Sequence, residues 1–576
     1  MRKLLKYLKN YKLQSILAPL FKLLEAGFEL FVPLVVSAII DNGINGGEGW
    51  RYVVNACLIL VALGAVGWIS AVAAQFFAAK AAVGFSKALR HDLFNKMQSL
   101  SYSDIDSIGT SKMITRMTSD VNQIQSGVNL VLRLFMRSPF IVFGAMIMAF
   151  VLDLVSGGVF AVTIAVLFIV VFAIILSSIP LYKKVQGKLD GVTASTRETL
   201  TGVRVLRAFC KEEEEITKYN KRNSELTKSQ ILVGKISALM NPLTYAIINV
   251  AIIVLLYVGA IKIDAGSLSQ GNVVALYNYM SQILVELIKL ANLIITVTKS
   301  FACAGRVNEI LEMHSQGLKN NSQNAINGSP YIEFKNVSVN YGDAEVDALS
   351  NISFCAERGQ TIGIIGGTGA GKTTLVNMIP HFYDTKCGNI LIDGQNVSEI
   401  NDEILRSKCG IVPQHAVLFK GTIRENMLWG KQTASDEEIM SAIKTAQAED
   451  IIKSKSDGLD ELVEQGGKNF SGGQRQRLTI ARALVKKPEI LILDDSASAL
   501  DYATDANLRK SLKELDYNPT VFIVSQRTSS IRHADKIIVL DGGKMVGMGT
   551  HEELLKNCEI YNEIHFTQYE KEGASL

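Results

Sequence analysis

The chain has 576 residues, of which 48% are hydrophobic and 20% carry a charge, and its mean hydropathy is +0.21. This length exceeds that of one ordinary globular domain, and the mixture excludes both a wholly soluble chain and one that lies wholly in lipid. The net charge of +4 is too weak to indicate nucleic acid as the main partner, so a membrane half joined to a soluble half remains.

The first segment, residues 1–14, is basic and amphipathic. It is followed by a long apolar stretch, whereas a signal peptide has a short apolar core and a small-residue cleavage site. We expect a helix that lies along the inner membrane surface, where its lysines contact anionic headgroups.

Six apolar stretches are long enough to cross about 30 Å of hydrocarbon, which takes roughly 20 residues of helix. They lie near residues 15–40, 52–79, 128–152, 156–180, 237–261 and 271–298. The two long connections, 80–127 and 181–236, have a helical pattern and carry many lysines and arginines, so the positive-inside rule places them in the cytoplasm. We therefore expect residues 1–306 to form a multi-pass transmembrane domain in the plasma (inner) membrane, with both termini cytoplasmic.

Charged residues occur within these stretches. Glu25 and Glu29 share one face of the first span, and Glu286 and Lys289 share one face of the sixth. Such charges either line a polar, cation-accepting translocation pathway or pair between helices, and the sequence leaves both alternatives open. Arg133 and Arg137 stand four residues apart at the start of the third span, and we expect both to extend to the inner headgroups.

The sequence pattern changes after a polar linker, residues 307–330. From residue 331 to 576, short strand-like runs alternate with helical stretches, which predicts an α/β domain with a largely parallel sheet. The predicted fold is therefore a six-span α-helical membrane domain followed by a soluble α/β domain.

The run GGTGAGKT follows the apolar run TIGII and precedes a helical stretch, which is the context of a phosphate-binding P-loop. Glycines let backbone N–H groups point at phosphate oxygens, the lysine supplies a cation, and the final hydroxyl can ligate Mg²⁺. The predicted ATP-binding residues of this segment are Gly366, Gly367, Thr368, Gly369, Ala370, Gly371, Lys372, Thr373 and Thr374.

A second apolar run, ILILD, ends at Asp494, where a carboxylate can hold Mg²⁺. Between it and the P-loop stands FSGGQRQR, residues 470–477. These three elements, in this order and spacing, resemble the ATP-binding cassette family, and the resemblance extends over nearly the whole chain because exporters of that family also carry six spans before the cassette.

The resemblance implies further site residues and two cofactors, ATP and Mg²⁺. Tyr341 is similar to the aromatic residue that stacks on adenine, and Gln414 to the glutamine that senses Mg²⁺ and contacts the membrane domain. Ser471, Gly472, Gly473, Gln474 and Asp501 are similar to residues that act in trans, on the ATP of a second half-transporter. The segments SDIDSIGTSKMITRMTSDV and ETLTGVRVLRAF resemble the two coupling segments, which convey movement from the ATPase to the spans.

Two positions depart from the family pattern. The residue after Asp494 is Asp495, where the family usually has the glutamate that polarises the attacking water. A carboxylate that is one methylene shorter falls short of the reach that a general base needs. The switch position is Gln526 in place of a histidine that contacts the γ-phosphate, and a glutamine amide cannot carry a positive charge.

Both departures concern the chain's own catalytic face, whereas Ser471 to Gln474 are intact. The hypothesis is therefore a degenerate half of a heterodimeric exporter that moves lipophilic small molecules, as in multidrug efflux. Three alternatives stay open: a homodimeric exporter of lipids, a homodimeric exporter of peptides, and a regulatory ATP-binding membrane subunit. In each case the expected surroundings are a lipid bilayer and, for the exporters, a hydrophobic substrate.

Overall fold

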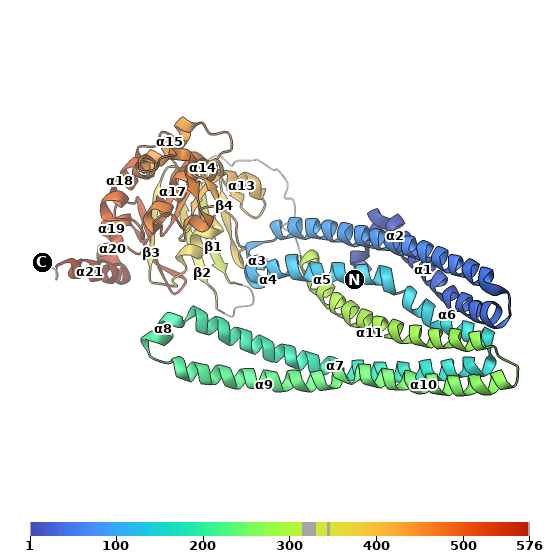
Figure 1. Ribbon diagram of the computed structural model, residues 1–576. Coiled ribbons are helices and arrows are strands. Elements are labelled where there is room, and N and C mark those ends of the chain that lie inside the picture. The colour runs from blue at the N-terminus through green and yellow to red at the C-terminus, as the bar shows by residue number, and fades with distance from the viewer. Residues whose placement is uncertain (1, 314–329, 342–345, 574–576) are drawn as a thin grey trace. The chain divides into compact units, whose positions relative to one another are not determined.

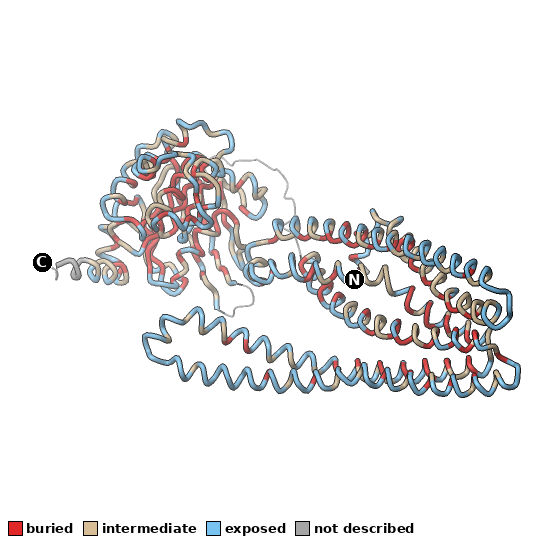
Figure 2. The backbone as a smooth tube through the Cα atoms, in the orientation of Figure 1, coloured by how far each residue is buried: buried red, intermediate tan, exposed pale blue. Residues whose placement is uncertain are grey.

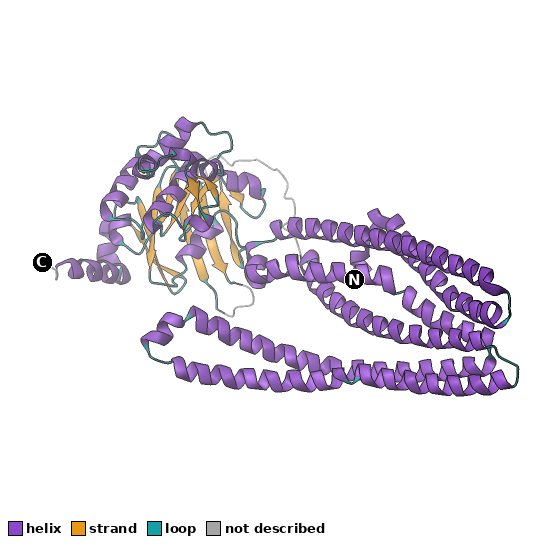
Figure 3. Ribbon diagram, viewed as in Figure 1, coloured by secondary structure: helices purple, strands orange, loops and turns teal. Residues whose placement is uncertain are grey.

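A computed structural model of the chain describes residues 2–313, 330–341 and 346–573 (Figure 1). The chain forms two compact units, of which the first contains residues 1–98 and 111–313 and the second contains residues 99–110 and 314–576. The first unit is helical and the second combines helices with sheets (Figure 3), as the sequence predicts. The short segment 99–110 is the exception, because it joins the second unit from within the first half of the chain.

Six helical stretches within the described ranges are long and apolar enough to cross a membrane, which confirms the predicted spans. They are Lys3–Asn45, Gly49–Gln98, Thr110–Leu152, Leu154–Thr201, Glu212–Asp264 and Gln270–Glu312. The stretches Gly49–Gln98 and Leu154–Thr201 are each one unbroken helix that continues into a long connection. The last one, α11 (Gln270–Glu312), reaches into the expected linker, and residues 314–329 of that linker lie outside the described part of the chain.

The remaining helices of this unit begin and end at defined residues. They are η1 (Arg2–Tyr11), α1 (Lys12–Ala38), η2 (Ile39–Asn45), α2 (Gly49–Gln98), η3 (Arg116–Asp120), α5 (Val121–Leu134), α6 (Arg137–Leu152), α7 (Leu154–Thr201), α8 (Val203–Ala208), α9 (Glu212–Ala238) and α10 (Met240–Asp264). Side-chain caps mark two of the starts: Asp153 accepts from the backbone N–H of Ser156 before α7, and Ser269 accepts from that of Asn272 before α11. The N-terminal η1 is amphipathic, since Leu4 and Tyr7 are buried while its lysines are exposed.

One apolar cluster joins α1, α6, α7, α10 and α11 (Figure 2). Tyr279 and Met280 of α11 are fully buried in it, and the Tyr279 hydroxyl donates to the carbonyl of Leu30 at 2.5 Å. These two side chains therefore pack between helices.

The expectation that Arg137 extends to the inner headgroups is wrong. Its side chain is buried and donates to Glu29 of α1 at 2.6 Å and to Glu286 of α11 at 2.5 Å. Glu286 also accepts from Ser138 and from Lys289. The charges within the spans are thus paired between helices, because an isolated charge in lipid or in a packed interior is costly.

The second unit contains two main sheets. The six-stranded sheet has the order β12-β11-β3-β10-β9-β6, and its neighbours pair in parallel except for β12, which pairs antiparallel with β11. Its strands are β3 (Thr361–Gly366), β6 (Cys409–Val412), β9 (Ile490–Asp494), β10 (Thr520–Val524), β11 (Lys536–Asp541) and β12 (Lys544–Gly549). The four-stranded sheet has the order β2-β1-β4-β5, with β1 (Ile332–Val339), β2 (Leu349–Ala356), β4 (Cys387–Ile392) and β5 (Gln395–Asn396).

Helices and two short strands complete this unit. They are α3 (Tyr102–Ile108), α4 (Thr110–Thr115), α12 (Lys372–Met378), α13 (Asp402–Lys408), β7 (Gly421–Thr422), α14 (Ile423–Leu428), α15 (Asp436–Thr445), α16 (Glu449–Lys453), η4 (Gly458–Asp460), β8 (Leu462–Val463), η5 (Gln465–Gly467), α17 (Gly472–Val485), α18 (Tyr502–Lys513), α19 (Thr528–Ile531), α20 (His551–Asn557) and α21 (Glu559–Gly573), where α4 continues into the first unit. Because β3, β10, β9 and β6 are parallel neighbours, the loops that follow them meet at one edge of the sheet.

The segment 99–110 is fastened to this unit by aromatic contacts. The Tyr102 ring stacks on Phe382 with centroids 4.2 Å apart, and the Tyr383 hydroxyl donates to the carboxylate of Asp106 at 2.8 Å. Residues 103–110 of it are the beginning of the first segment that resembles a coupling segment, SDIDSIGTSKMITRMTSDV.

Candidate functional site

The P-loop runs from the end of β3 into α12. Gly369 and Gly371 have φ angles of 79° and 93°, a left-handed conformation that favours glycine. At Gly366 a side chain would collide with the carbonyl of Leu540. The glycine pattern is therefore required by the path of this loop, which turns its backbone toward a potential anion at the start of α12.

Lys372 folds back over the loop. Its ammonium group donates to the carbonyls of Gly366 and Gly367 at 2.9 and 2.7 Å. Burial lowers the pKa of Lys372, and the carboxylates of Asp495 and Asp494 oppose that shift. The buried cation thus has two carbonyls as provisional partners and is placed to exchange them for phosphate oxygens.

Thr373 and Asp494 are two of the three predicted metal ligands, and the third is Gln414. The Thr373 hydroxyl donates to the Asp494 carboxylate at 3.0 Å, and burial raises the pKa of Asp494. A hydroxyl and one carboxylate suit Mg²⁺, which prefers hard oxygen ligands and usually keeps several waters. The described residues contain no group of three or more His, Cys, Asp or Glu side chains that could hold a metal, so Mg²⁺ here would depend on nucleotide oxygens and water as well.

Asp495 starts the turn that leads away from β9. It has a left-handed φ of 45°, and its N–H donates to the carbonyl of Val524 at 3.0 Å. The Gln414 amide, which follows β6, donates to the Asp495 carboxylate across 3.4 Å. Burial raises the pKa of Asp495. The sheet topology has therefore brought two predicted site residues together from segments 81 residues apart.

Tyr341 stands beside the P-loop helix. Its hydroxyl lies 2.9 Å from that of Thr374, and its ring meets the Tyr383 ring edge-on at 5.0 Å. The Tyr341 side chain remains partly exposed, with 41% of its surface accessible. An accessible ring in this place can stack on a base.

The segment SGGQ forms the start of α17 and lies apart from this group. Ser471 caps the helix in a capping box with Gln474, and a side chain at Gly473 would approach the carbonyl of Ala499 to 3.0 Å. Asp501 caps the following helix, α18, by accepting from the N–H of Thr504. Ser471 and Gly472 are exposed, so the segment is accessible to another molecule.

Gln526 follows β10, and its side chain is exposed. Its carbonyl accepts a hydrogen bond of 2.7 Å from the amide of Gln568 on α21. Sequence reasoning missed Gln568, because no motif surrounds it and 42 residues separate the two.

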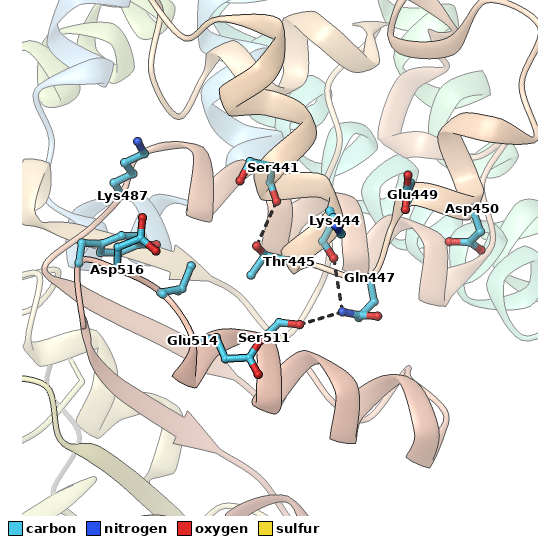
Figure 4. A pocket seen from close by; sticks show the side chains of 12 residues that line it. Ser441, Lys444, Thr445, Gln447, Glu449, Asp450, Lys487, Ser511, Glu514 and Asp516 are labelled. Carbon is cyan, nitrogen blue, oxygen red and sulfur yellow. Dashed lines mark hydrogen bonds between the residues drawn. The ribbon is translucent and has the colours of Figure 1, made fainter.

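A cleft of about 770 Å³ elsewhere in this unit contains none of the predicted site residues (Figure 4). Side chains from α15 and α18 line it, and the amide of Gln447 donates to the hydroxyl of Ser511 at 3.1 Å. The candidate site is therefore not this cleft but the edge of the six-stranded sheet where the loops after β3, β6, β9 and β10 meet.

Two family descriptions match the chain: "ABC transporter transmembrane region" over residues 15–287 and "ABC transporter" over residues 349–498. The uncharacterised ABC transporter ATP-binding protein YfiB of Bacillus subtilis is 35% identical over 575 residues, which cover 100% of both chains. The ATP-dependent lipid A-core flippase of Syntrophus aciditrophicus is 31% identical over 84% of this chain and 80% of its own. The solved structure of a bacterial Atm1-family ABC exporter with ATP bound has a TM-score of 0.79 and 24% identity, covering 96% of this chain and 97% of that one.

Proposed function

Because the chain belongs to the ATP-binding cassette (ABC) transporter family, with an exporter membrane region and an ATPase domain in one polypeptide, we propose that it is the degenerate half of a heterodimeric exporter. Family membership makes it a multi-pass membrane protein that couples ATP hydrolysis to transport. The proposal concerns the division of labour between its own ATP site and that of its partner.

The asymmetry of the cassette carries this proposal. Asp495 and Gln526 replace the residues that the family uses for catalysis, whereas the SGGQ segment begins α17 with an intact capping box. A chain with an altered catalytic face and an intact SGGQ segment fits beside an unlike partner, whose ATP this segment contacts in trans. A second copy of the same chain would leave both sites altered.

In the proposed cycle, the P-loop amides and Lys372 bind the phosphates of ATP, and Tyr341 stacks on its base. Thr373, Asp494 and Gln414 would hold Mg²⁺, which would neutralise charge on the terminal phosphates. Asp495 and the Gln526 side chain face the terminal phosphate. The shorter Asp495 carboxylate, held by Gln414, activates water poorly, so hydrolysis at this site is slow.

The partner's site is completed by Ser471, Gly472, Gly473, Gln474 and Asp501 of this chain. ATP at both sites draws the two cassettes together, and the segment 99–110 transmits that movement through Tyr102 and Asp106. ATP shifts the equilibrium only to the extent that it prefers the closed pair, so a slow site retains its ATP over several turnovers.

We propose lipophilic small molecules as the substrate, exported across the plasma membrane with the cassette and both termini in the cytoplasm. The cations of connections 80–127 and 181–236 support this orientation. A lipid is the second candidate, favoured by the likeness to a protein named as a lipid A-core flippase.

Steady-state ATPase activity of the purified chain, alone and with a half-transporter that has the catalytic glutamate and histidine, tests the proposal. We expect the chain alone to have almost no ATPase activity and the pair to be active. We also expect Asp495→Glu together with Gln526→His to restore hydrolysis at this chain's own site. Rapid ATP hydrolysis by the unaltered chain alone would indicate a homodimeric exporter and would contradict the proposal that this chain's own ATP site is degenerate.

A further inference from the structure

The last described helix, α21, contacts residues 526–528, called here the switch segment, through the side chains of Gln568 and His565. Gln568 donates through its amide to the carbonyl of Gln526 at 2.7 Å. Its carbonyl oxygen accepts from the N–H and the hydroxyl of Thr528 at 3.0 and 3.1 Å. One amide therefore bridges both sides of Arg527.

These hydrogen bonds replace a local helix cap. The short helix α19 begins at Thr528, and the residue in its N-cap position, Arg527, makes no side-chain cap hydrogen bond. An uncapped N-terminus leaves backbone donors without partners, and Thr528 is buried, with 1% of its surface exposed. Gln568 satisfies its N–H from another helix, and His565 of the same helix lies 3.3 Å from the Thr528 hydroxyl.

The helix that presents Gln568 is itself anchored. Tyr561 of α21 is fully buried, and its hydroxyl lies 2.7 Å from the imidazole of His551 on α20. The Gln568 side chain thus extends from a helix that is anchored by the buried Tyr561.

The switch segment also contacts the start of α18 and the loop before it. Arg527 lies over the ring of Tyr502 at 5.1 Å, and its guanidinium reaches the carbonyl of Leu500 at 3.5 Å. Residues 526–528 therefore have contacts both to α21 and to Leu500 and Tyr502.

We propose that Gln568 is a positioning residue of the ATP site, which sets the backbone at Gln526 so that its side chain meets the terminal phosphate of ATP. This inference rests on the proposed role of Gln526. It predicts an effect on ATP and none on ADP, because ADP lacks the phosphate that Gln526 contacts.

The test measures equilibrium binding of ATP and of ADP to the full-length chain in lipid nanodiscs without Mg²⁺. Under these conditions binding requires neither hydrolysis nor a partner, so the result is independent of whether this site is slow. We expect Gln568→Ala and Gln568→Glu to lower the affinity for ATP about three- to tenfold, which is the effect of losing one hydrogen bond. The affinity for ADP should not change.

Gln568→Glu separates positioning from stability. Its carboxylate still accepts from Thr528 but cannot donate to the carbonyl of Gln526, so α19 keeps its cap. Thr567→Ala is the matched control, since Thr567 is exposed and its hydroxyl donates to Glu563 of its own helix. We expect it to change neither affinity.

A double variant, Gln526→Ala with Gln568→Glu, should bind ATP no more weakly than Gln526→Ala alone. The proposal is overturned if the Gln568→Glu variant binds ATP as tightly as the unaltered chain, or if it loses affinity for ATP and ADP equally. It is also overturned if the losses of ATP affinity from Gln526→Ala and Gln568→Glu are additive.

Discussion

The guanidinium of Arg137 on α6 donates to the carboxylate of Glu286 on α11 across 2.5 Å, and both side chains are buried. The same guanidinium contacts Glu29 of α1. One cation therefore ties together three helices of the membrane unit, and Glu286 has a second cationic partner in Lys289.

We expect Arg137→Leu to destabilise the protein by about 3 kcal/mol, since the buried Glu286 carboxylate loses its guanidinium partner and keeps only the contribution of Lys289 and Ser138. Glu286→Leu should cost less than Arg137→Leu, because Arg137 keeps Glu29. The double variant should be more stable than the sum of the two losses predicts. Thermal unfolding of the solubilised protein measures this, and strictly additive losses would show that the two charges do not depend on each other.

Asp494→Asn should stabilise the nucleotide-free protein near neutral pH. Burial raises the pKa of Asp494, so the charged carboxylate costs free energy in the folded state, and an amide does not. For a raised pKa the native state binds protons more readily than the unfolded state, so stability falls as pH rises through this range. The increase in unfolding temperature, measured in EDTA, should become smaller as the pH is lowered. An increase that does not change with pH would show that the charge of Asp494 is not its cause.

In the proposed heterodimer, Ser471→Ala and Lys372→Ala should have opposite effects on the two ATP sites. If Ser471 contacts the partner's ATP, as proposed, its loss should abolish most steady-state hydrolysis while this chain still retains ATP. If Lys372 binds this chain's own ATP, its loss should abolish retention and reduce hydrolysis less. Photolabelling of each chain together with ATPase assays measures both, and equal effects of the two changes would contradict the division of labour.

Tyr383→Phe and Tyr102→Ala should impair transport while ATP binding persists. Tyr383→Phe removes the hydrogen bond to Asp106 and keeps the ring that contacts Tyr341. Tyr102→Ala removes the stack on Phe382 and should have the larger effect. The ratio of transported substrate to hydrolysed ATP is the relevant measurement, and an unchanged ratio in both variants would exclude this segment from coupling.

Local signals in the sequence predicted much of the fold. The six spans follow from apolar length, and the loop after β3 follows from its glycines, which the left-handed backbone at Gly369 and Gly371 requires. The contact between Gln414 and Asp495 also follows in outline, because both residues come after parallel strands of one sheet.

The parts that were missed depend on which distant elements meet. The apolar pattern of one helix shows neither that Arg137 faces Glu29 and Glu286 nor that it is buried. Gln568 has no motif around it, and its proposed role depends on the packing of α21 against α19. Helix packing partners are set by the whole chain, and one sequence does not reveal them.

The position of segment 99–110 has a consequence for how the protein is made. Asp106 and its partner Tyr383 are 277 residues apart, so the ribosome releases the segment long before the surface that receives it. At about 5–20 residues per second, the delay is on the order of tens of seconds. During synthesis the segment therefore remains for that time without the surface that receives it, and a cassette expressed from residue 331 onward would leave Phe382 and Tyr383 without their contacts to Tyr102 and Asp106.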